Sequence, residues 1–209
     1  HILNALCDIG LGYLSLGQPS TTLSGGEAQR VKLAKYLGQK SLVTEILILD
    51  EPSTGLHPQD LAGLLAVLDR LVRAGATIIV VEHNTDVIRT ADWVVDLGPG
   101  AGPQGGQLLY AGPVEGLLDI NSPTGKALSE EAGFQSNWET SSISCVARPM
   151  HTAIRISGAR IHNLRNVSVD IPKGKMTVVT GVSGSGKSSL VHDVLEAEAR
   201  RRFLETLSL

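Results

Sequence analysis

The stretch "TVVTGVSGSGKSSLV" (residues 177–191) decides the fold of this chain. Within it, "GVSGSGKS" (181–188) matches the pattern G-x-x-x-x-G-K-[ST]. The motif follows the strand-like apolar run "KMTVVT" (175–180) and precedes a segment with helical spacing, which is the context this pattern requires. The sequence therefore predicts a strand, a phosphate-binding loop and a helix, in that order.

Each residue type in this loop has a physical role. Its three glycines let the backbone bend so that several N–H groups point at one phosphate, assisted by the N-terminus of the helix. Lys187 is expected to reach the β- and γ-phosphates, and the Ser188 hydroxyl to ligate Mg²⁺. The alternative, a Gly/Ser turn that only caps a helix, is disfavoured because Lys and Ser are both present. The predicted cofactor-binding set is Gly181, Gly184, Ser185, Gly186, Lys187, Ser188 and Ser189.

A second candidate phosphate contact lies upstream, in "LSGGEAQR" (23–30). Gly25 and Gly26 stand at a predicted helix start, where backbone N–H groups can approach an anion closely, and the Ser24 hydroxyl can donate to a phosphate oxygen. Taken alone, the same residues fit an N-cap with a Glu in the first turn. The residues downstream favour the functional interpretation.

Two carboxylates, Asp50 and Glu51, follow the buried strand predicted at 45–50. Asp50 is suited to hold Mg²⁺ and Glu51 to polarise the attacking water. The alternative is that "DEP" only begins a turn, although acidic side chains after "ILIL" are costly unless the strand end opens onto a site. His83 ends the next predicted strand, where it could contact the γ-phosphate, and polar residues at successive strand ends favour a functional role.

The order of predicted elements indicates an α/β fold. Continuous apolar strands on either side of the amphipathic helix at 58–75 are typical of a parallel sheet flanked by helices. An edge strand is expected at 105–113, and short strands at 153–157 and 165–171 predict a small antiparallel part before the phosphate loop. The predicted parts are residues 1–131, a linker at 132–152 that is rich in Ser and expected to be disordered, and residues 153–209.

Composition narrows the function classes. The 209 residues carry a net charge of −3, which argues against a strongly basic nucleic-acid platform. No apolar run approaches the length of about 20 residues that spans a bilayer, and no signal peptide is present, so a cytoplasmic protein is expected. Cys7 and Cys145 form no C-x-x-C pair, so no zinc site is expected. The first residue is not Met, which suggests an incomplete chain.

The ordered set S-G-G-E, "LILDEP", "STGLH" and "VEHN" resembles the signature, Walker B, D-loop and switch histidine of the ABC-type ATPase superfamily. The longer stretches "LGQPSTTLSGGEAQRVKLA", "VVEHNTDVIRTADWVVDLGPGAG", "GARIHNLRNVSVDIPKGK" and "TGVSGSGKSSL" resemble the UvrA family, the DNA-damage-recognition subunit of the bacterial excinuclease ABC. The resemblance covers most of the chain outside 133–150.

The resemblance implies an ATPase of nucleotide excision repair and the SOS response, with ATP and Mg²⁺ as cofactors. It implies that Glu51 and His83 are catalytic, and that Asp50 and Ser188 hold Mg²⁺. The signature residues Ser24–Gly26 would cap the phosphate of an opposing site. DNA, a second copy of the protein and a UvrB-like subunit are the implied partners, and ATP turnover is coupled to DNA loading and release. Zinc belongs to the parent family.

The order of the motifs is unusual, because an ABC domain runs from phosphate loop to signature and here the signature comes first. We expect residues 1–131 to close one nucleotide-binding domain and 153–209 to open another whose remainder lies beyond Leu209. Asp50, Glu51 and His83 would then complete a site whose own phosphate loop is missing. A tandem, permuted or incomplete chain fits this order. Alternative functions are a drug-resistance paralogue, a transporter ATP-binding subunit, or a nucleotide binder without hydrolysis.

Overall fold

The computed structural model describes residues 2–37, 46–131 and 153–207. The predicted linker at 132–152 lies outside these residues, as does Cys145, so both expectations remain predictions. Within the described ranges, every helix is too short or too polar to cross a bilayer.

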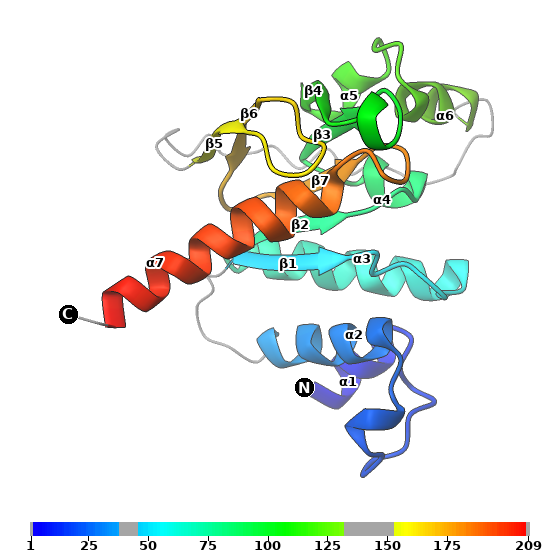
Figure 1. Cartoon of the computed structure of the whole chain (residues 1–209). Coiled ribbons are helices and arrows are strands. Elements are labelled where there is room, and N and C mark those ends of the chain that lie inside the picture. The colour runs from blue at the N-terminus through cyan, green and yellow to red at the C-terminus, as the bar shows by residue number, and fades with distance from the viewer. Residues whose placement is uncertain (1, 38–45, 132–152, 208–209) are drawn as a thin grey trace.

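A five-stranded sheet forms the centre of the molecule (Figure 1). Its strands are β1 (Ile46–Asp50), β2 (Thr77–Val81), β3 (Trp93–Gly98), β4 (Gln107–Gly112) and β7 (Met176–Thr180). Their order across the sheet is β1-β2-β7-β3-β4. The first four strands in this order are parallel. The edge strand predicted at 105–113 is confirmed as β4, which pairs antiparallel with β3. The α/β class with a mainly parallel sheet is therefore confirmed.

The position of β7 differs from the expectation of two separate partial domains. β7 comes from the last part of the chain, yet it lies between β2 and β3, both from the first part. Its pairing with β2 runs from Ile78 opposite Met176 to Val81 opposite Val179. The strand completes a sheet that would otherwise be split, because β2 and β3 each pair with β7 and not with each other. The strands of residues 46–112 and the strand at 176–180 thus share one sheet.

Helices pack on the larger apolar cluster, either against the sheet or against the helix that covers it (Figure 1). They are α1 (Ile2–Asp8), α2 (Gly25–Tyr36), α3 (Pro58–Arg73), α4 (Thr85–Arg89), α5 (Val114–Leu117) and α6 (Pro123–Glu131). In α3, Leu64, Leu68 and Leu71 recur at helical spacing and are fully buried. The short helix α4 is absent from the sequence prediction. Its signal is Asn84, whose Oδ1 accepts hydrogen bonds from the N–H groups of Asp86 and Val87.

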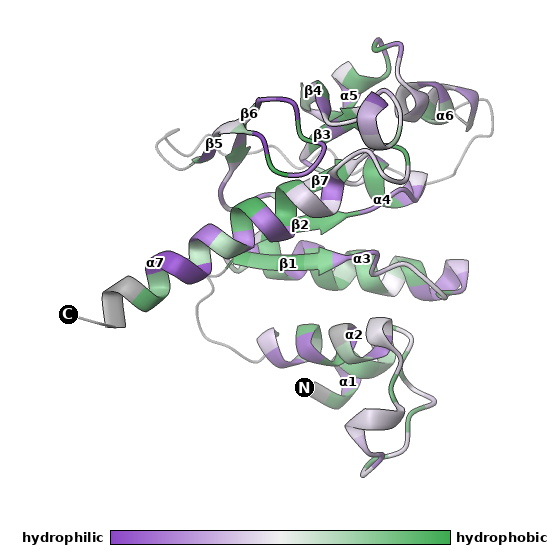
Figure 2. Cartoon of the chain, in the orientation of Figure 1, coloured by the Kyte–Doolittle hydropathy of each residue, from purple (hydrophilic) through white to green (hydrophobic). Residues whose placement is uncertain are grey.

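The other face carries a second apolar cluster. It is covered by the two-stranded antiparallel sheet of β5 (Ala153–Ala159) and β6 (Val167–Pro172), and by the helix that follows the phosphate loop. That helix begins as a π-helical stretch, η3 (Ser189–Glu196), and continues as α7 (Ala197–Leu207). The predicted small antiparallel part is confirmed. Because both faces of the parallel strands are covered, their residues form the continuous apolar runs seen in the sequence (Figure 2). The described residues also include two 3₁₀ turns, η1 (Ser20–Thr22) and η2 (Gly102–Gln104).

A threonine in β7 offers a test of this packing. Thr177 is fully buried, and its Oγ1 has no hydrogen-bond partner among the described residues. Replacing Thr177 with Val removes the unsatisfied hydroxyl and keeps the shape of the side chain. We expect the free energy of unfolding, measured by urea titration, to rise by about 1 kcal/mol.

Thr77 in β2 is the matched control for this prediction. It is also buried, but its Oγ1 accepts a hydrogen bond of 2.9 Å from the Gly174 N–H. Thr77→Val leaves that N–H without its acceptor and should lower the free energy of unfolding by about 1–2 kcal/mol. Equal losses of stability in the two variants would contradict the assignment of Thr177.

Candidate active site

The strand register brings the predicted site residues to one edge of the sheet. Asp50, at the end of β1, lies opposite Val81 in β2, and Val81 lies opposite Val179 in β7. The segments that follow these positions are Glu51, His83 and the phosphate loop 181–188. Because the carboxyl ends of parallel strands meet at the same edge, residues more than 120 positions apart come together there.

The catalytic candidates Glu51 and His83 are neighbours. Nδ1 of His83 lies 3.8 Å from Oε1 of Glu51, and both side chains are about half exposed or more. Glu51 has a φ of +43°, a left-handed backbone conformation that is uncommon for a residue with a side chain. Its carbonyl accepts a hydrogen bond of 3.0 Å from the Thr54 N–H, which closes the turn after the strand. The strained turn thus directs a carboxylate out of the sheet edge, beside the histidine.

The phosphate loop has the tight backbone that its glycines predict. Gly181 has a φ of +127°, and a Cβ there would lie 1.9 Å from the Leu97 carbonyl oxygen. Gly186 has a φ of +105°, and its Cβ would lie 2.8 Å from Leu164. No side chain fits at either position. Ser185 is fully buried within the loop, and its Oγ has no hydrogen-bond partner among the described residues. A loop of this shape fits the phosphate group that the sequence pattern predicts.

Lys187 folds back over the loop. Its ammonium donates to the carbonyl oxygens of Gly181 at 2.9 Å and Val182 at 3.1 Å. Burial lowers the pKa of Lys187, and the carboxylates of Glu51, Asp50 and Asp96, which act to raise it, offset part of this effect. The negative charges at the neighbouring strand ends therefore favour the charged form of Lys187. Lys187 and the "DEP" turn both lie at the carboxyl-end edge of the parallel strands.

Two buried carboxylates near this edge are absent from the sequence prediction. Glu82 is fully buried; its Oε1 accepts from the Ser53 N–H at 2.9 Å, and its Oε2 from the N–H groups of His83 and Asn84. It joins the turn after Glu51 to the segment of the switch histidine. The buried Asp96, in β3, accepts a hydrogen bond of 3.0 Å from the Thr124 hydroxyl. Burial raises the pKa of Asp96, and hydrogen bonds and Lys187 oppose this shift.

Asp50 and Ser188, the predicted metal ligands, carry oxygen atoms of the kind that Mg²⁺ prefers. Among the described residues, no group of three or more His, Cys, Asp or Glu side chains gathers to hold a metal. Two protein ligands still fit Mg²⁺, which is usually held by one or two side chains together with waters and substrate phosphates. Ser188 is exposed at the start of η3, and the side chain of Asp50 is about half exposed.

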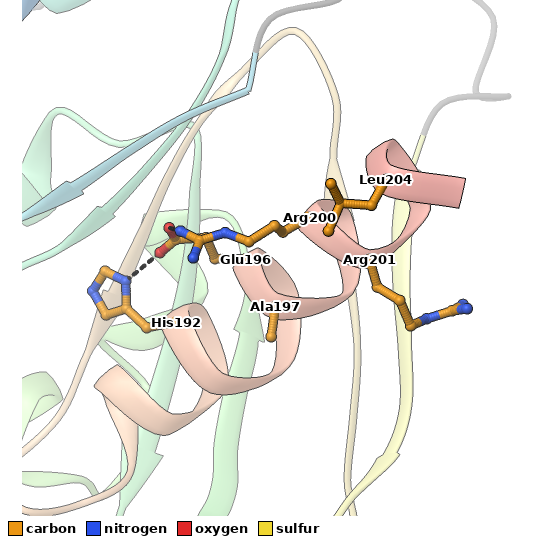
Figure 3. A pocket seen from close by; sticks show the side chains of 6 residues that line it. All are labelled: His192, Glu196, Ala197, Arg200, Arg201 and Leu204. Atoms are coloured by element: carbon orange, nitrogen blue, oxygen red, sulfur yellow. Dashed lines mark hydrogen bonds and ion pairs between the residues drawn. The ribbon is translucent and has the colours of Figure 1, made fainter. Parts of the chain in front are cut away.

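A histidine on the helix after the loop touches the metal-ligand candidate. Nε2 of His192 lies 3.5 Å from Oδ2 of Asp50, while its Nδ1 lies 2.8 Å from Oε2 of Glu196. Figure 3 shows His192 and Glu196 at one end of an open pocket of about 470 Å³ along the helix, lined further by Ala197, Arg200, Arg201 and Leu204. The residues that line this pocket all belong to this helix, and none belongs to the phosphate loop.

The signature residues lie apart from the loop. Ser24 caps α2 as predicted: its Oγ accepts from the Glu27 N–H at 3.3 Å, and Oε2 of Glu27 accepts from the Ser24 N–H at 2.6 Å. Among the described residues, no hydrogen bond joins Ser24–Gly26 to residues 181–188. The buried Arg30 connects α2 to the carbonyl of Pro52, the residue after Glu51. The signature helix is therefore anchored to the turn that carries Glu51.

The cap of α2 gives a stability prediction. Ser24→Ala removes the oxygen that satisfies the Glu27 N–H, and we expect a loss of about 1 kcal/mol in the free energy of unfolding. Ser24→Asn supplies another capping oxygen and should restore most of this loss. The measurement is urea unfolding followed by circular dichroism. An alanine variant as stable as the wild type would show that the cap does not support the helix.

The mainly parallel sheet and the phosphate loop at its edge place this chain in the class of P-loop nucleoside triphosphatase folds of the ABC type. A solved structure supports this class: UvrA2 from Deinococcus radiodurans is 44% identical, with a TM-score of 0.59, over 96% of this chain and 24% of that one. A scan against models of known protein families found no match.

The sequence relatives narrow the class to one family. UvrABC system protein A from Mycobacterium tuberculosis is 47% identical over 203 residues, which is 96% of this chain and 20% of the relative. The protein of the same name from Thermus thermophilus is 45% identical over 203 residues, 97% of this chain and 21% of the relative. The chain belongs to the UvrA family and spans about a fifth of the length of these relatives. Because one alignment covers both parts of the chain, the signature precedes the phosphate loop in the relatives too.

Proposed function

We propose that this chain binds ATP·Mg²⁺ at the edge of the sheet where β1, β2 and β7 end. The single observation that carries the proposal is the position of β7 beside β2, because it brings the phosphate loop to the carboxylates of the "DEP" turn and to the switch histidine. Burial lowers the pKa of Lys187, and the charges of Glu51 and Asp50 oppose this shift, which is consistent with one shared site.

Within this site, the side chains have distinct roles. Lys187 and the N–H groups of the loop hold the β- and γ-phosphates, and Ser188 and Asp50 hold the metal. Mg²⁺, when bound, neutralises phosphate charge during the transfer. Glu51 accepts a proton from the attacking water, and His83, 3.8 Å away, contacts the γ-phosphate. The products of the proposed reaction are ADP and phosphate.

The signature supplies the second half of a composite site. Ser24–Gly26 lie at the start of a 12-residue helix, and a Cβ at Gly25 would meet no heavy atom within 4 Å, so this helix start is open to another surface. We propose that it caps the γ-phosphate of an opposing site, in another part of the protein or in a second copy. ATP binding and hydrolysis would close and open the two halves.

The biological setting follows from the family. We propose that the intact protein acts with DNA and a UvrB-like subunit in nucleotide excision repair, since relatives named UvrABC system protein A match nearly the whole chain. The same relatives favour repair over a transporter subunit. A drug-resistance paralogue is distinguished by activity: ATP hydrolysis stimulated by damaged DNA supports repair, and stimulation by a DNA-binding drug alone supports the paralogue.

Isothermal titration of the chain with ATP tests the nucleotide site. We expect saturable binding in the presence of Mg²⁺ and weaker binding when EDTA removes the metal. The proposed site would be refuted if circular dichroism shows that the chain is folded and no heat of binding is detected at millimolar ATP.

A further inference from the structure

A second glycine-rich loop packs against the phosphate loop. Its sequence is "GPGAGPQGG" (98–106), between β3 and β4, and we call it the second glycine loop. The Gly102 N–H donates to the Gly184 carbonyl at 3.0 Å, and the Gly106 N–H donates to the Ser185 carbonyl at 2.9 Å. Two successive carbonyls of the phosphate loop thus have their donors in a segment about 80 residues away.

Asn163 completes this contact from a third segment, the turn between β5 and β6. Its side-chain Nδ2 donates to the Gly184 carbonyl at 3.0 Å and to the Gly102 carbonyl at 3.3 Å. One amide group therefore bridges the phosphate loop and the second glycine loop. Its donors match the two carbonyl acceptors, which no carboxylate in that position would do.

The three segments meet without spare room. A Cβ at Gly106 would lie 1.8 Å from the Asn163 carbonyl oxygen, and a Cβ at Gly105 would lie 3.1 Å from the Ser185 Cα. The Arg165 N–H donates to the Gly106 carbonyl at 2.7 Å, which ties the turn to the loop again. Small shifts of the turn or of the second glycine loop must therefore move the phosphate loop.

A phosphate-binding loop needs such support for a physical reason. Its N–H groups converge on the anion, so its carbonyls point away from the phosphate and require donors of their own. Without these donors, the peptide planes are free to rotate and the N–H groups lose their common direction. We propose that Asn163 and the second glycine loop are positioning elements of the nucleotide site, and that they hold the phosphate loop in the conformation that binds phosphate. This inference rests on the proposed ATP site.

The substitution Asn163→Asp tests the proposal, because it keeps the side-chain shape and replaces the amide donor by a negatively charged acceptor facing two carbonyls. We expect the Kd for ATP·Mg²⁺ to rise roughly tenfold. Asn163→Ala, which removes the donor without adding charge, should have a smaller effect in the same direction. Asn166→Asp is the matched control, since Asn166 lies in the same turn and, within the described part of the chain, its side chain only accepts, through Oδ1, from Arg160. It should bind ATP·Mg²⁺ as the wild type does.

A second measurement needs no nucleotide. Hydrogen exchange of the free chain reports on the Gly102 and Gly106 amides, which donate to the phosphate loop. In Asn163→Asp and Asn163→Ala we expect these two amides to exchange at least about tenfold faster, with the amides of α3 unchanged. A merely structural role would speed exchange throughout the sheet or leave it unchanged everywhere.

The outcomes separate the inference from the proposed function. Unchanged exchange at Gly102 and Gly106 in both Asn163 variants would overturn the positioning role, whatever the nucleotide affinity. If exchange in the Asn163 variants is faster only at these amides, and the wild-type chain binds no ATP, the positioning role is supported and the proposed ATP site is refuted. Faster exchange together with weaker ATP·Mg²⁺ binding supports both.

Discussion

Replacing Lys187 with Ala is expected to raise the Kd of the chain for ATP·Mg²⁺ by at least about 100-fold, measured by isothermal titration. The ammonium already lies over the phosphate loop, where it donates to the carbonyls of Gly181 and Val182. A bound phosphate offers it charge-assisted hydrogen bonds, which are roughly twice as strong as neutral ones. Alanine supplies neither the charge nor the donors, so the remaining N–H groups of the loop hold the phosphate alone.

The same variant should fold normally. Burial lowers the pKa of Lys187, which means that the folded protein holds the charged ammonium less favourably than water does. Removing the side chain therefore takes away a group whose charge works against folding, and the melting temperature should stay within a few degrees of the wild type. Lys173→Ala is the matched control, because Lys173 is exposed in the turn before β7, at the other end of the strand. Nucleotide affinity that is equal in both variants would refute the assignment of the phosphate loop.

Local patterns predict the elements of this fold well. The strands β2 and β7 are continuous apolar runs, and α3 begins after His57 at Pro58, as the helix-start signals indicate. The N-cap at Ser24 is confirmed because a capping box is formed by residues three positions apart. These signals involve residues within one turn or one strand, so a single sequence is enough to predict the element.

The assembly of the sheet is a different matter, because it depends on contacts between distant residues. Nothing within "KMTVVT" indicates that this strand pairs with β2 and β3, whose residues precede it by about 80 to 100 positions. Glu82 and Asn163 were not predicted for the same reason. Glu82 bonds to Ser53, 29 positions away, and Asn163 bonds to Gly102, 61 positions away. A polar residue beside a strand end does indicate a site, but its partner is identified only by the fold.

The order of the chain also becomes intelligible from these contacts. The expectation that Asp50 and Glu51 lack a phosphate loop assumed that each part of the chain belongs to its own sheet. In the structure, the phosphate-loop strand lies beside β2, so the phosphate loop follows the same edge of the sheet as Asp50 and Glu51. Among the described residues, no hydrogen bond joins Ser24–Gly26 to the phosphate loop, which is why we propose that the start of the signature helix serves an opposing site.

Replacing Glu51 with Gln should separate binding from hydrolysis in the intact protein. The carboxamide keeps the size of the side chain but accepts no proton from water, so we expect the rate of ATP hydrolysis to fall by about 10²–10³-fold. Binding should change little, because Lys187, Ser188 and Asp50 are all retained. The variant is therefore expected to trap ATP, measured as retained radiolabelled nucleotide after gel filtration.

The control is Glu115→Gln, an identical substitution on the exposed face of α5. It should hydrolyse ATP at the wild-type rate. Turnover by Glu51→Gln within about fivefold of the wild type would show that another group accepts the proton. If instead both hydrolysis and binding are lost, the left-handed turn at Glu51 is needed to shape the site, and the carboxylate has a structural role in addition to a chemical one. Retained binding with lost turnover is the result that the neighbouring positions of Glu51 and His83 predict, because neither side chain belongs to the loop that grips the phosphates.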